Sequence, residues 1–207
     1  MLDDSLRSFL DRLGSADPVP GGGAASALAA ALAANLFKMV VALTRQKEAD
    51  KNDLLAPVEA RLNDLATDLG ALVTRDADAY QRVRHAYQMP KDAEDQRIRR
   101  AMEIQLAMRE ATNVPLEVAQ RCVELLESAI DVVVLGRPSA ISDAGTANFL
   151  ALSAAMGALL NVQVNLEHVD DDDFVASASS RAVAIQERCH ACFEQVRVKI
   201  AERMGAA

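Results

Sequence analysis

Apolar residues recur at every third or fourth position along almost the entire chain. In the first stretch, residues 2–13, the apolar positions are Leu2, Leu6, Phe9, Leu10 and Leu13, and Gly14 follows directly. This spacing puts the apolar side chains on one face of an α-helix, and glycine is a common helix terminator. The same pattern predicts five longer helices: Ala24 to about Arg45, residues 48–87, residues 91–136, a helix that ends near Leu166, and Asp172 to Met204.

Strand-like alternation is nearly absent, and the β-branched run at 131–135 is the only stretch that competes with a helix. We therefore expect an all-α fold, with one domain over residues 1–207. It should be a bundle of long helices with a glycine-rich turn before the central helix. Pro115 falls inside a predicted helix and should kink or split it. Ser142 is expected to cap the helix that ends near Leu166.

Composition supports a packed soluble bundle. Of the 207 residues, 51% are hydrophobic but only 3% are aromatic, so alanine, leucine and valine must fill the core. Small side chains let helices approach closely. The formal net charge of −8 argues against nucleic acid as a partner, because nucleic acid selects for basic surfaces.

A membrane or export role is not expected. The stretch from Ala24 to Leu43 is about long enough to span a bilayer, but it contains Ser26, Asn35 and Lys38. A buried central helix explains it better. The acidic, amphipathic start of the chain does not resemble a signal peptide. Three cysteines, an odd number, provide no disulfide framework and suit a reducing cytoplasm.

The glycine run Gly21–Gly23 follows two prolines and precedes the most apolar helix. No Gly-Lys-Ser/Thr closes it and no strand precedes it, so neither a Walker loop nor a dinucleotide turn fits. Two interpretations stay open. The glycines permit a tight entry into a crowded helix, or they expose backbone N–H groups to an anion or a developing negative charge.

Four polar positions are candidates for chemistry. Asp76 and Tyr80 lie four residues apart, on one face of a helix, and form either a solvated helix end or a pair directed into a cleft. Asp143 falls in the first turn of a helix, where a carboxylate is kept ionised, so it is a cap or a functional acid. Asn161 and Asn165 lie one turn apart in an apolar segment. Buried amides need partners, which here are either a structural network or a ligand.

Three other features are weaker than they look. Cys189 and Cys192 have metal-like spacing, but no second pair accompanies them, so buried core thiols are expected. The acidic run 170–173 suits a flexible helix start better than a Mg²⁺ site. His85, beside a predicted helix end, is a weak candidate for a base. No metal site is expected.

Several motifs, taken in order, resemble one family. They are PVPGGGAASALAAALAA, DADAY, MPK, ATNVPL and SDAGTANFLALSAAMGALLNVQVNL. Together they are similar to the cyclodeaminase and cyclohydrolase enzymes of folate one-carbon metabolism, the formiminotransferase-cyclodeaminase family. The resemblance runs from the first helix to about Leu166. It implies an all-α, dimeric or larger protein with folate in a cleft beside the glycine turn.

The resemblance also assigns residues. Gly21, Gly22 and Gly23 match the family's glycine entry, Asp76 and Tyr80 its acid and aromatic residue, Lys91 its Leu-Pro-Lys turn, Ser142 and Asp143 its Ser-Asp pair, and Asn161 and Asn165 its asparagine pair. One region departs from the family pattern. Ala42 replaces an asparagine, and the run at 45–50 keeps only Arg45 and Lys47 of a basic stretch.

The implied chemistry is hydrolysis of 5,10-methenyltetrahydrofolate to 10-formyltetrahydrofolate. Alternatives are formiminotetrahydrofolate cyclodeamination, which releases ammonia, and a folate- or pterin-binding module without turnover. The resemblance implies Asp143, Asp76 and Tyr80 as catalytic groups, with the glycines, Ser142 and the asparagines orienting the substrate and Lys91 holding the folate carboxylates. Neither reaction requires a metal or redox cofactor. A homodimer in the cytoplasm, with no nucleic acid or membrane partner, completes the expectation.

Overall fold

The computed structural model describes residues 5–205, which form an all-α bundle without strands and are almost entirely helical. The helices are α1 (Leu6–Leu13), α2 (Gly22–Lys47), α3 (Asn52–Gln88), α4 (Glu94–Leu135), α5 (Ile141–Leu166) and α6 (Asp172–Met204), with short 3₁₀ turns at Ala49–Lys51 and Pro138–Ala140. The all-α prediction is confirmed, and the run 131–135 belongs to α4. The start of the first predicted helix, at Leu2, lies outside the described residues.

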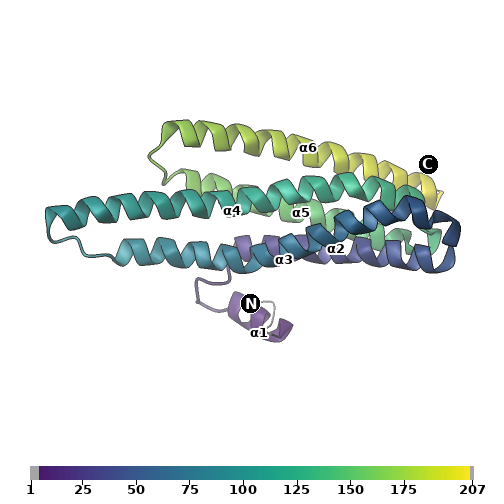
Figure 1. Cartoon of the computed structure of the whole chain (residues 1–207), viewed down its shortest axis with the longest axis horizontal. Coiled ribbons are helices and arrows are strands. Elements are labelled where there is room, and N and C mark those ends of the chain that lie inside the picture. The colour runs from purple at the N-terminus through teal and green to yellow at the C-terminus, as the bar shows by residue number, and fades with distance from the viewer. Residues whose placement is uncertain (1–4, 206–207) are drawn as a thin grey trace.

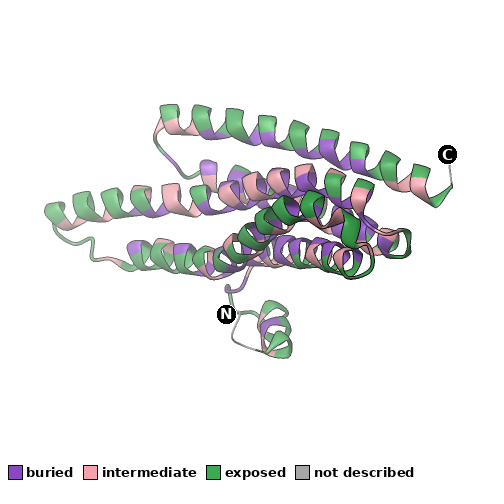
Figure 2. Ribbon diagram, turned by 45° about the vertical axis from the view of Figure 1, so that its right-hand side comes forward, coloured by how far each residue is buried: buried purple, intermediate pink, exposed green. Residues whose placement is uncertain are grey.

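The five long helices lie side by side, and α1 stands apart beside one end of α2 (Figure 1). Within the bundle α2 packs against α3 and α5, while α4 packs against α3, α5 and α6. Figure 2 shows the buried faces turned toward the centre of the bundle and the exposed faces outward. One main core joins all these helices, and even α1 contributes Phe9 to it.

Helices α2 and α5 pack through small side chains. Their buried positions are mostly alanine: Ala24, Ala27, Ala30, Ala31, Ala33 and Ala34 in α2, and Ala144, Ala147, Ala151, Ala154, Ala155 and Ala158 in α5. A Cβ added at Gly157 would lie only 2.6 Å from Ser26 Oγ. The predicted close helix approach is therefore realised at this interface, and it fixes α2 against α5 over most of their length.

Pro115 does not split its helix. Helix α4 runs uninterrupted from Glu94 to Leu135, with Pro115 buried inside it. Proline lacks an N–H, so the carbonyl of Ala111, four residues earlier, loses its usual helical donor. The side-chain Nδ2 of Asn165 on α5 donates to that carbonyl at 2.6 Å. A neighbouring helix thus supplies the hydrogen bond that the proline cannot make.

Ser142 is not the cap of α5. That helix begins at Ile141, and its N-cap residue is Ala140, which makes no side-chain capping bond. A 3₁₀ turn at Pro138–Ala140 already leads the chain into α5, so Ser142 lies within the first turn. Asp143 lies there too, as predicted.

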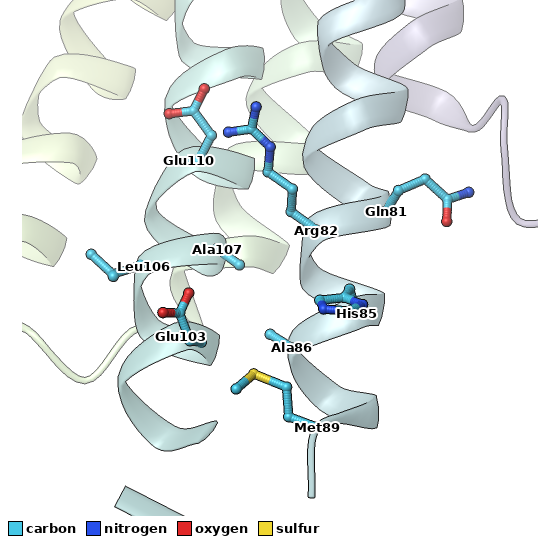
Figure 3. A pocket seen from close by; sticks show the side chains of 9 residues that line it. All are labelled: Gln81, Arg82, His85, Ala86, Met89, Glu103, Leu106, Ala107 and Glu110. Atoms are coloured by element: carbon cyan, nitrogen blue, oxygen red, sulfur yellow. The ribbon is translucent and has the colours of Figure 1, made fainter. Parts of the chain in front are cut away.

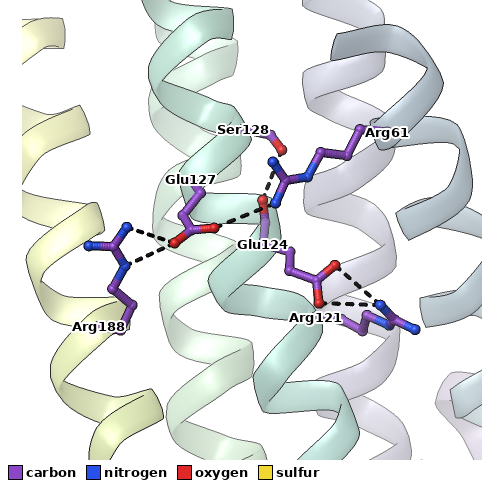
Figure 4. A network of polar contacts seen from close by, with 6 residues as sticks. All are labelled: Arg61, Arg121, Glu124, Glu127, Ser128 and Arg188. Atoms are coloured by element: carbon purple, nitrogen blue, oxygen red, sulfur yellow. Dashed lines mark hydrogen bonds and ion pairs between the residues drawn. The ribbon is translucent and has the colours of Figure 1, made fainter. Parts of the chain in front are cut away.

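Surface ion pairs tie α3, α4 and α6 together (Figure 4). Glu127 on α4 accepts from Arg188 of α6 at 2.7 Å and faces Arg61 of α3 at 3.5 Å. Six residues earlier, Arg121 pairs with Glu124 on its own helix and with Asp68 of α3. Exposed pairs contribute little free energy each, so we assign this network a role in helix alignment more than in stability.

The three cysteines are buried free thiols, as predicted for Cys189 and Cys192. Burial raises the pKa of Cys189 to about 12 and also raises the pKa values of Cys122 and Cys192.

Two segments, Gly22–Lys47 and Pro138–Leu166, are long and apolar enough to cross a membrane by length and composition. In the fold, 50% and 33% of their most apolar windows are buried.

Candidate functional site

A cavity of about 570 Å³ opens where the glycine turn meets the helices α3, α4 and α5. The turn, with the first residues of α2, contributes Pro18, Val19, Gly21, Gly22 and Gly23. Helix α3 contributes Asp76, Ala77, Ala79, Tyr80, Val83, Arg84 and Tyr87, α4 Met108 and Ala111, and the region of α5 Asn161, Val164, Asn165 and His168. Seven of the residues singled out from the sequence line this one cavity: Gly21, Gly22, Gly23, Asp76, Tyr80, Asn161 and Asn165.

Asp76 lies directly against Gly23. A Cβ built on Gly23 would come within 2.6 Å of the Asp76 carboxyl carbon, so any other residue at 23 would displace the carboxylate. Burial raises the pKa of Asp76, while the backbone N–H of Ala24 acts in the opposite direction. A half-buried carboxyl group with a raised pKa in a cleft is a typical acid–base candidate.

The structure realises the first interpretation of the glycine run, a tight entry into a crowded helix, and the second stays a prediction. Helix α2 begins at Gly22 with Gly21 as its N-cap, and the cap makes no side-chain hydrogen bond. Gly23 serves close packing against Asp76, while Gly21 and Gly22 expose backbone to the cavity. The negative group at the start of α2 is the chain's own Asp76, whose carboxylate the Ala24 N–H stabilises.

Asn161 and Asn165 both line the cavity, and each is held by a hydrogen bond through its side-chain nitrogen. Asn161 Nδ2 donates to the carbonyl of Gly157 at 2.9 Å, and Asn165 Nδ2 donates to that of Ala111 at 2.6 Å. A carbonyl only accepts hydrogen bonds, so each amide must turn its nitrogen toward it. Neither Oδ1 accepts a hydrogen bond from residues 5–205, so both are open to a donor.

The outer part of the cavity holds residues that the sequence reasoning missed. Arg84, Tyr87 and His168 line it and are exposed, and Arg84 forms no ion pair within residues 5–205. The helical period could have found two of them, because Asp76, Tyr80, Arg84 and Tyr87 recur every three or four residues on one face of α3. His168 follows the end of α5, where periodicity gives no guidance.

Three predicted site residues lie elsewhere. Lys91 is exposed in the connection between α3 and α4 and does not line the cavity. Asp143 and Ser142 occupy the first turn of α5, whereas Asn161 lies near its other end. At 1.5 Å per residue, Asp143 and Asn161 are about 27 Å apart along the helix axis. Within one chain, the structure does not bring Asp143 or Ser142 to Asp76.

A second hollow, of about 420 Å³, lies between α3 and α4 (Figure 3). Arg82 of α3 extends toward Glu110 of α4, and His85 and Glu103 lie further along the same gap. Of the residues considered from the sequence, only the weak candidate His85 lines this hollow. Across residues 5–205 there is no group of three or more His, Cys, Asp or Glu side chains that could hold a metal ion.

The family follows from comparison with known proteins. A family model described as formiminotransferase-cyclodeaminase matches residues 5–184. The chain belongs to this family. The resemblance noted in the sequence is thereby confirmed.

Proteins of two kinds are similar in sequence to this member of the formiminotransferase-cyclodeaminase family. The methenyltetrahydrofolate cyclohydrolase of Methylorubrum extorquens is 34% identical, with 96% of this chain and 98% of that protein aligned. The formimidoyltransferase-cyclodeaminases of Mus musculus and Sus scrofa are each 33% identical over 84% and 87% of this chain. The chain spans only 32% and 34% of those two longer proteins.

The fold of this family member also has a counterpart among solved structures. The crystal structure of formiminotetrahydrofolate cyclodeaminase from Thermotoga maritima superposes with a TM-score of 0.86. The superposition covers 97% of this chain and 98% of that one, at 24% sequence identity. That likeness establishes the shared all-α architecture.

The raised pKa of Asp76 predicts a pH signature in stability. As pH rises from about 4, the unfolded carboxyl loses its proton before the folded one does, so the wild type loses free energy of unfolding. Asp76→Asn does not titrate and is spared this loss. We expect the stability of Asp76→Asn relative to wild type to increase as the pH rises from about 4 to 7 in chemical denaturation.

The exposed neighbour Asp78 provides the control for this measurement. Asp78→Asn should show no comparable increase relative to wild type over the same pH range. A stability difference for Asp76→Asn that stays flat or falls with rising pH would show that burial does not disfavour its ionised form.

Proposed function

We propose that the protein hydrolyses 5,10-methenyltetrahydrofolate to 10-formyltetrahydrofolate. The observation that carries the proposal is the inner end of the cavity, where the half-buried Asp76 lies against Gly23 and the side chains of Asn161 and Asn165 line the same space. The full-length similarity to a methenyltetrahydrofolate cyclohydrolase supports it.

The reaction needs a group that accepts and returns a proton beside a cation. The methenyl carbon bridges N5 and N10 of the folate and carries positive charge, which ionised Asp76 offsets. Asp76 takes a proton from the attacking water as the new C–O bond forms, and it returns that proton to N5 as the C–N5 bond breaks. The hydroxyl proton leaves to solvent, and the formyl group remains on N10. This sequence includes no redox step.

The other lining residues suit the rest of the ligand. The Oδ1 atoms of Asn161 and Asn165 are placed to accept N–H groups of the pterin ring. Tyr80 lies one helical turn from Asp76 and offers a phenol to the tetrahedral adduct. We assign Gly21 and Gly22 to backbone contact with the pterin, because a side chain there would narrow the cavity.

Two alternatives remain. Formiminotetrahydrofolate cyclodeamination uses the same one-carbon bridge and fits the names of the other relatives. A binding module without turnover would keep the cavity but not the proton transfer, and the altered run at 45–50 motivates that alternative.

We propose a cytoplasmic location for either activity, because all three cysteines are free thiols.

The first test follows the absorbance of methenyltetrahydrofolate. We expect the purified protein to accelerate its loss above the spontaneous rate. Gly23→Ala should lower turnover about 10²-fold or more, because the new Cβ displaces the acid–base carboxylate. Gly14→Ala is the matched control, since its Cβ would meet the Leu10 carbonyl oxygen at an ordinary 3.5 Å, at the end of α1 and outside the cavity lining.

Each alternative gives its own outcome in that assay. Methenyl formation and ammonia release from formiminotetrahydrofolate, without methenyl hydrolysis, would identify a cyclodeaminase. Saturable folate binding with neither reaction would identify the binding module. Normal turnover by Gly23→Ala would remove Asp76 from the mechanism.

The outer end of the cavity suggests how the folate tail is held. Arg84 lies eight residues beyond Asp76 on α3, about 12 Å along the helix. A folate that puts its one-carbon bridge at Asp76 extends its aminobenzoyl-glutamate arm in that direction, past the apolar side chains of Val83 and Val164. A guanidinium that forms no ion pair with the described residues is well matched, at that position, to a glutamate carboxylate.

This assignment is tested with a substrate that lacks the glutamate. Arg84→Met should raise KM for methenyltetrahydrofolate about tenfold and leave KM for methenyltetrahydropteroate unchanged. Arg82→Met, which removes the same charge beside the second hollow, is the control. If Lys91→Met produces the glutamate-dependent change instead, the tail lies along the α3–α4 connection, as the family resemblance implied.

We further propose that the protein acts as a homodimer. Large apolar side chains remain exposed on α2 and α5: Leu32, Met39, Leu43, Phe149, Leu160 and Val164. These two helices pack side by side, and Val164 also lines the cavity, so the apolar face reaches the cavity rim. Apolar faces of this kind typically mark interfaces.

A two-fold dimer on this face would also give Asp143 a role. With the symmetry axis crossing the middle of α5, two copies of that helix run antiparallel. The first turn of one α5 then lies beside the Asn161 end of the other. Asp143 of the partner subunit would thereby approach the cavity that its own chain does not reach.

Mixed dimers test this arrangement. Asp76→Asn and Asp143→Asn homodimers should both be impaired. A heterodimer of the two, isolated with two affinity tags, has one site with both acids and should recover about half the wild-type turnover. An inactive heterodimer would place Asp143 outside the partner's site, and a monomer at micromolar concentration would exclude the dimer.

A further inference from the structure

Pro115 and Asn165 form one structural unit across two helices. Pro115 is buried in the middle of α4 and cannot donate to the carbonyl of Ala111. Asn165 Nδ2 occupies the vacated position at 2.6 Å, from a different helix. A buried carbonyl without a donor is costly, so the pairing is strongly favoured.

This pairing dictates which end of the amide faces the ligand. The Ala111 carbonyl accepts and does not donate, so the nitrogen of Asn165 must point to α4. Asn165 lines the cavity, and its Oδ1 accepts no hydrogen bond from the described residues. The side chain therefore presents a fixed acceptor on the cavity wall.

Asn161 illustrates the difference. Its Nδ2 binds the Gly157 carbonyl, which belongs to its own helix one turn earlier. That carbonyl keeps its ordinary helical donor, so the bond is supplementary. For Asn165 the carbonyl has no other donor, because the residue four positions later is proline.

We infer that Pro115 is a positioning residue for the ligand, acting through Asn165. By withholding its own N–H, Pro115 reserves the Ala111 carbonyl for Asn165 and holds Asn165 Oδ1 ready to accept an N–H of the pterin ring. The inference rests on the proposed function for the identity of the ligand. The orientation of the amide is independent of it.

Replacing the proline should release the asparagine. In Pro115→Ala the backbone N–H at position 115 returns to the Ala111 carbonyl and competes with Asn165. We expect KM for methenyltetrahydrofolate to rise about three- to tenfold with kcat little changed, as for the loss of one oriented hydrogen bond. Asn165→Ala should raise KM to a similar extent.

The double variant separates positioning from packing. Adding Pro115→Ala to Asn165→Ala should raise KM no further, because the amide is already gone. In thermal unfolding, Asn165→Ala should destabilise the wild type more than it destabilises Pro115→Ala, where Ala111 has a backbone donor. Pro57→Ala, at an exposed helical proline on α3, should leave KM unchanged.

A direct readout does not depend on turnover. The side-chain amide protons of Asn165 should exchange slowly with solvent by NMR in the wild type and faster in Pro115→Ala. Equal exchange rates, or an unchanged KM in a folded Pro115→Ala, would overturn the inference. If the wild type neither binds nor converts folates, the proposed function and the ligand half of the inference fail together, while the exchange rates still decide the orientation.

Discussion

The close packing of α2 against α5 is the constraint on which the site depends. Alanine faces and the Gly157–Ser26 approach hold the two helices at short range. The start of α2 is thereby fixed beside the far end of α5, which sets the glycine turn opposite Asn161. Helix α3, packed on the other side of α2, then delivers Asp76 to the same point. Side chains of ordinary size at this interface would separate these groups.

Much of the fold and the inner site could be predicted because the signals were local. The helical period identified the long helices, and spacing of four paired Asp76 with Tyr80 and Asn161 with Asn165. What could not be predicted depends on contacts between distant segments. Pro115 leaves α4 intact, and Asn165, fifty residues later, supplies the donor that the proline lacks. Asp143 belongs to a motif of the family. Its distance from Asp76 depends on the direction in which α5 runs through the bundle, and the spacing of residues along the sequence does not determine that direction.

Asp76 has two roles that pull in opposite directions. As the acceptor beside the Ala24 N–H it supports the start of the central helix, and ionisation favours that role. Burial of Asp76 disfavours the same ionised form and raises its pKa, so the carboxyl group can hold a proton at a higher pH than an exposed one. Gly23 permits both, because only a residue without a Cβ leaves room for the carboxylate at this distance. The contact between Gly23 and Asp76 therefore serves both helix packing and the proposed proton transfer.

The cavity walls have a consequence for how a ligand enters and leaves. Apart from Pro18, Val19 and Gly21 in the turn, and His168 just beyond α5, the lining comes from helices packed into the main bundle. Among residues 5–205, most of the wall is therefore held in place by the bundle and cannot swing over a bound molecule as a lid. The ligand's own rings must then help to exclude bulk solvent from the reacting carbon. For a reaction that consumes water, rigid walls let water, the second substrate, reach the site without a conformational change.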